Sequence, residues 1–335
     1  MRSRKRSLIH RRNFLARTVP VAAAALAFAF PAPSIAQTAY PTRPIRVIVP
    51  FAAGGPSDII ARILADALYQ SLGQSVVVEN RAGGGANIGI GLAARAEPDG
   101  YTLLATTSAI VINPSLYKTI PFDPIKSFTP ISDLAISSQM LSVMPDFASS
   151  LGDFIAKAKA NPGKFNYSSP GVGTQAQLTV ELLKLRAGID ITHVPFSGGP
   201  PAVQALMSGT VQFVTNAVPT SEALARQGTI RAVAVSGEKR WPSLPDVPTL
   251  VESGYPGFVT DTFAGLFAPA GTPQDIVTKL STEVAAILKQ PDTNERLSRE
   301  GADPVGSSPQ EFGRFMQSEI EKWRKVIRAA GIEPS

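Results

Sequence analysis

The sequence predicts an α/β protein with two lobes that face one ligand cleft. Short apolar strands alternate with amphipathic helices along most of the chain, which is the pattern of βαβ units with a parallel sheet. A glycine-rich turn joins a strand to a helix at Gly54, and the same device returns at Gly171 in the second half. The two halves share no residue-level repeat, so this common turn is what indicates two lobes.

The opening unit, residues 45–72, sets the pattern for the chain. Residues 45–50 form a β-branched run typical of a strand buried on both faces, and residues 60–68 have the apolar spacing of an amphipathic helix. Between them, Gly54 and Gly55 let the backbone approach a ligand without interference from a Cβ atom. The N–H groups of the helix start favour an anion there. An ordinary tight turn of an α/β domain is the alternative interpretation.

Residues 1–36 predict an export signal that is cleaved after Ala36, which places the mature protein in the periplasm. Seven basic residues precede an apolar run of about a dozen residues, too short for a transmembrane helix of roughly 20. The pair Arg11-Arg12 resembles a twin-arginine signal. His10 stands where that signal usually has Ser or Thr, so the general secretory route also stays open.

Composition excludes several classes of function. Removing the seven basic residues of the export signal from 32 leaves 25 against 26 acidic residues, a net charge of −1. The high pI therefore belongs to the signal, and no nucleic-acid partner is expected. The chain has no cysteine, and His193 is the single histidine after residue 36. We therefore expect no metal site, no Ser-His-Asp triad and a structural role for His193.

The rest of the first half continues the alternation. Gly73 ends the first helix; strands are predicted at 76–78 and 101–105, a helix at 88–96, and a proline-rich surface connection at 114–130. The strand at 101–105 leads into the hydroxyl side chains of Thr107 and Ser108. Ligands of parallel α/β sheets lie beyond the carboxyl ends of the strands, where Gly54 and these hydroxyls fall.

The second half has the same organisation. Strands are predicted at 139–144, 165–168, 191–194, 211–215, 230–235 and 263–267. Helices are predicted from the capping box at 150–153 to residues 161–163, at 175–186, and at a segment that ends near residue 208. The strand at 263–267 is expected to lead back to the first lobe. Two long helices finish the chain, and both Thr272 and Ser308 have capping-box spacing with proline at the first helical position.

Catalytic and cofactor motifs are weak. Residues 171–176 fit the G-x-G-x-x-A spacing of a dinucleotide loop, but an exported protein has little access to nicotinamide cofactors and no acidic residue closes a downstream strand. We therefore expect no cofactor. The sequence contains no G-x-S-x-G elbow and no phosphate loop. Asp58, two residues into its helix, is interpreted as stabilising the turn and the helix dipole, with a general-base role as the alternative.

Motifs along essentially the whole mature chain carry a resemblance to a known family. They are Pro-Thr-Arg-Pro-Ile at 41–45, Val-Pro-Phe-Ala-Ala-Gly-Gly at 49–55 with Asp58, Val-Glu-Asn-Arg at 78–81, Asn-Pro-Gly-Lys at 161–164, Leu-Pro-Asp-Val-Pro-Thr at 244–249, and Gly-Leu-Phe-Ala-Pro-Ala-Gly-Thr-Pro at 265–273. In this order they resemble the periplasmic receptors of tripartite tricarboxylate transporters, the Bug-type family.

The resemblance implies a periplasmic binding protein of type II, the "Venus flytrap" fold. Lobe 1 is then expected at 37–138 plus 260–335, and lobe 2 at 139–259. The export signal, the paired glycine turns and the missing catalytic constellation lead us to expect that the protein is not an enzyme. The resemblance implies that it binds a small carboxylated solute and delivers it to integral-membrane transporter subunits, and we expect a monomer.

In that family two loops, one from each lobe, pinch a carboxylate through backbone amides and bridging waters. The matching positions are residues 51–58 and 168–174. With the neighbouring strand ends they give the predicted ligand-binding set: Phe51, Ala53, Gly54, Gly55, Ser57, Asp58, Thr107, Ser108, Ser168, Ser169, Gly171, Gly173, Thr174, Gln175, Ser197, Gly198 and Asn216.

Two positions depart from the family pattern. Ser197 stands where the family commonly has Lys, and Asn216 where it commonly has Asp. The carboxylate grip, which is mostly backbone, is expected to survive these changes, whereas the solute itself stays open. Because an ammonium group in a closed cleft needs a negative partner that Asn lacks, we predict a natural ligand without a free amine.

Two other functions remain as alternatives to a solute receptor. The first is an exported hydrolase or lyase that uses Asp58 with hydroxyl groups such as those of Thr107 and Ser168. The second is a signalling adaptor of the same fold, whose closed form is read by a membrane sensor.

Overall fold

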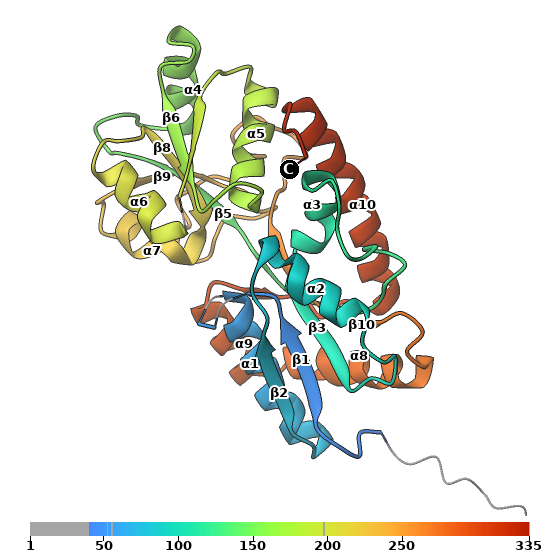
Figure 1. Ribbon diagram of the computed structural model, residues 1–335. Helices are drawn as coiled ribbons and strands as arrows, with labels where there is room; N and C mark the ends of the chain where they lie inside the picture. The colour runs from blue at the N-terminus through green and yellow to red at the C-terminus, as the bar shows by residue number, and fades with distance from the viewer. Residues whose placement is uncertain (1–39, 52, 55, 197, 335) are drawn as a thin grey trace, which may run out of the picture. The chain divides into compact units, whose positions relative to one another are not determined.

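The computed structural model describes residues 40–51, 53–54, 56–196 and 198–334 (Figure 1). The predicted export signal with its cleavage after Ala36, and the predicted site residues Gly55 and Ser197, lie outside the described residues. Within the described part every helix falls short of the length or the apolarity that a bilayer crossing requires.

The first sheet has six strands in the order β11-β4-β10-β3-β1-β2. Their bounds are β1 (Ile45–Val49), β2 (Val76–Asn80), β3 (Thr102–Thr107), β4 (Phe128–Ser137), β10 (Thr262–Pro269) and β11 (Asp303–Pro304). β1 is parallel to β2 and β3, whereas β10 runs antiparallel between β3 and β4. The sheet is therefore mixed, and the expectation of a parallel sheet was only partly right.

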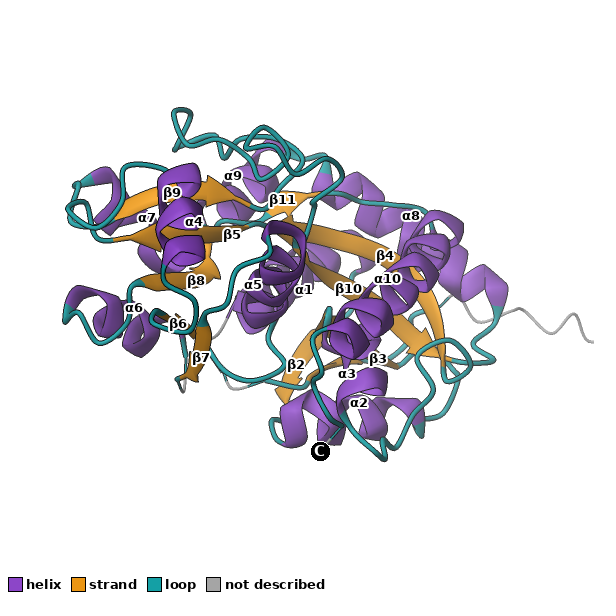
Figure 2. Cartoon of the chain, turned by 90° about the horizontal axis from the view of Figure 1, so that it is seen from above, coloured by secondary structure: helices purple, strands orange, loops and turns teal. Residues whose placement is uncertain are grey.

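Helices cover both faces of the first sheet (Figure 2). They are α1 (Pro56–Leu72), α2 (Asn87–Ala94), α3 (Ala109–Leu116), α8 (Gln274–Leu288), α9 (Pro291–Arg299) and α10 (Pro309–Ala329). One apolar cluster joins the sheet to α1, α8 and α9, and a second joins it to α2, α3 and α10. β1 lies between these clusters, which confirms the prediction of a strand buried on both faces.

The second sheet has five strands in the order β7-β6-β8-β5-β9. Its elements are β5 (Gln139–Val143), β6 (Asn166–Ser169), β7 (Thr192–Pro195), β8 (Phe213–Ala217) and β9 (Arg231–Val235), with α4 (Leu151–Ala160), α5 (Gln175–Ala187), α6 (Gly199–Met207) and α7 (Val218–Arg226). Apolar clusters pack α4 and α5 on one face and α6 and α7 on the other. The two sheet-plus-helix lobes that the sequence predicted are present.

The chain passes between the two sheets twice, at Ser138 and through residues 236–261. A hydrogen-bond network ties these crossings together: the Ser236 hydroxyl accepts from the Gln139 amide (2.8 Å) and donates to the Asp261 carboxyl (2.8 Å). Packing there is tight, because a Cβ added to Gly237 would lie 2.6 Å from the Ser138 hydroxyl. The boundaries of the lobes at 138/139 and 259/260 stay a prediction.

Several local predictions were wrong. The stretch 114–130 is not simply a surface connection, since α3 extends through Pro114 to Leu116 and β4 begins at Phe128. Burial of Ile110, Val111 and Ile112 outweighs the helix-breaking tendency of the proline.

Other differences concern helix starts. α7 and α9, both of which have proline in their first turn, were not predicted. Thr272 does not cap α8, because its hydroxyl donates to the Pro269 carbonyl instead. The capping box of α10, formed by Ser308 and Glu311, is confirmed.

Candidate ligand-binding site

Asp58 holds the turn between β1 and α1 in place. Its buried carboxylate accepts from the Gly54 amide (2.8 Å), from Arg62 Nε (3.0 Å) and from Asn80 Nδ2 (2.9 Å). The same Asn80 amide group donates to the Phe51 carbonyl (3.1 Å), so both ends of the turn are fixed. Gly54 has φ +80°, a conformation that favours glycine. These bonds agree with the turn-stabilising role predicted for Asp58.

The ionisation of Asp58 follows from these contacts. Burial of the carboxyl opposes ionisation, but hydrogen bonds from Arg62, the Gly54 amide and Asn80, with the charge of Arg62, lower the pKa to about 2. A carboxylate with so low a pKa is a weak base near neutral pH. This environment does not favour the alternative in which Asp58 takes a proton from a substrate.

The donors that this turn offers to a ligand are the first amides of α1. Pro56 has no N–H, and the Gly54 amide is already used, so Ser57 and Asp58 supply the first free amides of the helix. Ala53 and Gly54 are exposed and Ser57 is half-buried. The turn is therefore open at the positive end of the helix dipole.

The matching turn in the second lobe joins β6 to α5. Thr174 caps the helix by accepting from the Gln177 amide (3.3 Å), and its hydroxyl donates to the Gly171 carbonyl (2.8 Å). The Gln177 side chain in turn accepts from the Gly173 amide (2.6 Å). Because Thr174 accepts from the Gln177 amide, Gln175 and Ala176 supply the first free amides of α5.

His193 and Ser169 support this second turn. His193 Nε2 lies 2.7 Å from the Ser169 hydroxyl, which also accepts from the Gly171 amide (3.2 Å). The imidazole ring stacks on Tyr167 with 4.7 Å between ring centroids, and burial lowers the pKa of His193 to about 4. The histidine is therefore neutral at physiological pH and packs as the structural residue that was predicted.

Both lobes meet the segment 260–262, which leads into β10. From the second lobe, Gln175 Nε2 donates to the Thr260 carbonyl (3.0 Å). From the first lobe, the Ser108 hydroxyl lies 3.1 Å from that of Thr262 and accepts from the Phe263 amide (3.2 Å). The starts of α5 and α3 thus converge on one crossing segment.

Gly173 brings the second-lobe turn against the first lobe. It has φ +78°, and a Cβ atom placed on it would lie 2.6 Å from Leu116 Cδ1 at the end of α3. The positive φ favours glycine at this approach, and any side chain there would require Leu116 to shift.

Several predicted residues are bonded to the protein interior. The fully buried Ser168 hydroxyl donates to the Ala202 carbonyl (2.8 Å), and the fully buried Asn216 Oδ1 accepts from the Ser221 hydroxyl (2.9 Å). The Thr107 hydroxyl accepts from the Ala109 amide at 3.4 Å. The structure therefore does not bring all predicted side chains into one cluster.

Six buried polar atoms have no hydrogen-bond partner among the residues that the structure describes, and three of them belong to predicted site residues or their direct neighbours at helix starts and strand ends: Thr106 Oγ1, Gln175 Oε1 and Asn216 Nδ2. These three lie near the end of β3, at the start of α5 and near the end of β8, the positions where a ligand is expected. A buried polar group without a partner is uncommon and needs an explanation, which a polar ligand provides. In the same described part, no group of three or more His, Asp or Glu side chains is placed to hold a metal ion.

The predicted set missed some residues that the structure brings to these turns. Asn80 is the last residue of β2 and lies in the Val-Glu-Asn-Arg motif, so its position at a strand end was a usable signal. Thr260 and Thr262 had no such signal, because residues 236–261 show no periodic pattern and their contacts are distant in sequence.

Two sheet-plus-helix lobes, joined by crossing segments and each carrying a glycine turn before a helix start, define a periplasmic binding protein of type II. Residues 60–332 match the sequence profile of the "Tripartite tricarboxylate transporter family receptor", and the chain belongs to this family of solute receptors.

Relatives and solved structures agree with this assignment. The protein BugT of Bordetella pertussis is 37% identical over 305 residues, covering 90% of this chain and 93% of BugT. A structure of R. palustris Rpa4515 with adipate shares 38% identity at a TM-score of 0.78, covering 88% of this chain and all of that one. MatC of Rhodopseudomonas palustris with bound malate shares 34% identity at a TM-score of 0.73, and the match covers 86% of this chain and 100% of the MatC chain.

Proposed function

We propose that this chain is an exported receptor that captures a small carboxylate between its two lobes and passes it unaltered to the membrane subunits of a tripartite transporter. The observation that carries this proposal is the pair of helix starts, α1 in one lobe and α5 in the other, each preceded by a glycine turn. The adipate and malate in the two similar structures are both dicarboxylates, which supports the class of solute.

The first amides of a helix hold an anion through hydrogen bonds and through the dipole. Because α1 and α5 belong to different lobes, a dicarboxylate that spans them draws the lobes together. Gln175 and Asn216 each keep one buried polar atom unpaired for the solute. We accordingly retain the predicted ligand-binding set, the predicted lobe boundaries, a monomeric state and export with cleavage after Ala36 as parts of this proposal.

A receptor without catalytic activity is favoured over a hydrolase or lyase by the state of the two candidate bases. Asp58 is ionised and committed to three hydrogen bonds in the turn. His193 is stacked on Tyr167 and bonded to Ser169. Both groups support the backbone that presents the amides.

We expect folding stability to rise with the right carboxylate. A solute at about 100 times its dissociation constant adds about 2.7 kcal/mol, which for lobes of this size is roughly 5 to 10 °C in melting temperature. Differential scanning fluorimetry with adipate, malate, tricarboxylates and aromatic acids measures this. Adipamide, in which amides replace the carboxylates of adipate, is the matched control. If adipamide shifts the transition and no acid does, the anion argument is wrong.

The relative affinity for an acid and for its amino analogue tests whether Asn216 contributes to the choice of solute. The unpaired Nδ2 of this side chain is a hydrogen-bond donor, which suits a carboxylate or hydroxyl oxygen and not an ammonium group. We expect the wild type to bind malate at least about tenfold more tightly than aspartate, and Asn216→Asp to shift the preference towards aspartate. Titration calorimetry with both solutes decides, and a wild type that prefers aspartate contradicts this account.

A further inference from the structure

The outer face of α10 is basic although the mature chain is close to neutral. Arg314, Arg324, Lys325 and Arg328 are exposed along it, with Glu321 as the acidic residue among them. With a predicted net charge of −1 after removal of the export signal, the protein as a whole gives no reason for such a stripe. The face therefore carries a local positive field.

These charges are largely uncompensated. Arg324 Nη2 lies 4.0 Å from Glu321 Oε1, a weak pair between two exposed side chains. Within the described residues Lys325 and Arg328 have no side-chain hydrogen bond or ion pair. By contrast, Lys322, on the inner side of the helix, pairs with Glu319 at 2.5 Å. The outer cations are thus available to an external partner.

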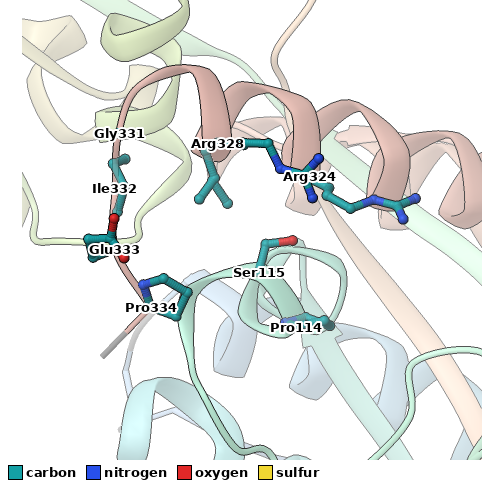
Figure 3. Close-up of a pocket in the computed structure, with 9 residues that line it drawn as sticks. Pro114, Ser115, Arg324, Arg328, Gly331, Ile332, Glu333 and Pro334 are labelled. Atoms are coloured by element: carbon teal, nitrogen blue, oxygen red, sulfur yellow. The ribbon is translucent and has the colours of Figure 1, made fainter.

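Hollows of side-chain size lie along the same face. Figure 3 shows one of about 340 Å³ between the end of α10 and the end of α3, lined by Arg324, Arg328, Ser115 and Glu333. Two more, of about 470 and 510 Å³, are lined mostly by α10: the first shares Arg324 and Arg328 with this hollow, the second also includes Ile125, and Arg324 borders all three. The face can therefore receive protruding side chains between its cations.

The inner face of α10 connects the two lobes. Trp323 and Ile327 belong to one apolar cluster with Leu116 of α3 and Leu178 of α5, and α10 packs against both helices (Figure 1). Lys322 Nζ also donates to the Val259 carbonyl (3.3 Å), within the crossing at 236–261. A partner bound to the outer face would act on the helix that joins the lobes.

We propose that Arg324, Lys325 and Arg328 dock an acidic segment on the periplasmic side of the transporter's membrane subunits. This inference rests on the proposed delivery function. Charge complementarity selects an acidic partner. A lipid surface fits less well, because a helix that lies on a membrane presents large apolar residues, and none of the large apolar side chains exposed in the described chain lies on α10.

The test measures binding of the purified receptor to proteoliposomes that contain the transporter's membrane subunits. The triple variant Arg324→Gln, Lys325→Gln, Arg328→Gln removes the three cations. The matched control, Lys159→Gln, Lys164→Gln, Lys289→Gln, removes three exposed lysines from other parts of the surface. Lys159 lies in the last turn of α4, which matches the position of Arg328 in the last turn of α10. Flotation at about 50 and about 500 mM NaCl gives the salt dependence.

We expect the triple variant to bind at least about tenfold more weakly, the control to change less than about twofold, and high salt to abolish the difference. Equal binding by the triple variant and the wild type overturns the proposal, as does an equal loss in the control. Equal binding of the wild type to protein-free phosphatidylglycerol vesicles also overturns it, in favour of a membrane surface. The thermal shift with adipate or malate, measured on the same proteins, reports separately whether solute binding itself holds.

Discussion

Replacing Gly173 with valine is expected to weaken solute binding by about 100-fold or more and to leave the protein folded. The residue has φ +78°, and a Cβ atom at this position would lie 2.6 Å from Leu116 Cδ1. The Leu116 side chain can shift, but a β-branched residue is strained at this φ, so we expect the β6–α5 turn to change its backbone conformation and to shift the amides of α5 relative to those of the first lobe. Titration calorimetry with adipate or malate measures the affinity, and thermal denaturation checks the fold.

Gly188→Val is the matched control. Gly188 caps the far end of the same helix with φ +63°, and a Cβ atom there meets nothing within 4 Å. Valine at position 188 suffers the same backbone strain but lies away from the β6–α5 turn. The folding stability of this variant should therefore fall, while its affinity for the solute should stay unchanged. Gly54→Val, at φ +80° and in open space, should abolish binding through the first-lobe turn. Unchanged affinity in Gly173→Val or Gly54→Val would remove the corresponding turn from the site.

Asp58→Ala is expected to destabilise the protein by about 3 kcal/mol and to abolish solute binding. The substitution removes the common acceptor of three hydrogen bonds, from the Gly54 amide, Arg62 and Asn80, each worth about 1 kcal/mol. Urea denaturation and calorimetry measure the two effects. Asp153→Ala is the control, because Asp153 also accepts from the amide four residues before it, Ser149, and from a cation four residues after it. It should lose some stability and no affinity; loss of affinity in both variants would contradict the assigned role of Asp58.

The contribution of Asp58 depends on pH in a defined direction. Its pKa is lowered to about 2 in the folded protein, so the folded state binds this proton less readily than the unfolded chain does. The stabilisation is therefore fully present above the unfolded value near 4 and is lost as the pH falls towards 2. The difference between wild type and Asp58→Ala should be constant from about pH 8 to 5 and shrink below about pH 4.

The sequence could predict those parts of the fold that depend on neighbouring residues. The strand, turn and helix of residues 45–72 and the capping box at Ser308 are local signals, and both are present. The insertion of β10 antiparallel between β3 and β4 could not be predicted, because it depends on pairing between strands well over a hundred residues apart. The helix through Pro114 likewise depends on burial against distant elements.

The candidate site also has parts that local sequence could predict and parts that depend on distant contacts. Both glycine turns follow from local pattern, and so does the role of Asp58 in fixing the first of them. The directions of Ser168 and Asn216, which bond to α6 and α7, depend on which face of the second sheet each residue occupies. The convergence of Ser108 and Gln175 on residues 260–262 depends on how the chain crosses between sheets, which no local pattern encodes.

Mass spectrometry of the solute released when the purified, exported protein is denatured tests the central claim most directly. We expect the receptor to bind a carboxylate through the first amides of α1 and α5 and not to convert it. Each chain should therefore release one small carboxylic acid that has no free amine and is the unaltered solute. Release of a neutral compound, of an amine or of a reaction product in place of that acid would contradict the account.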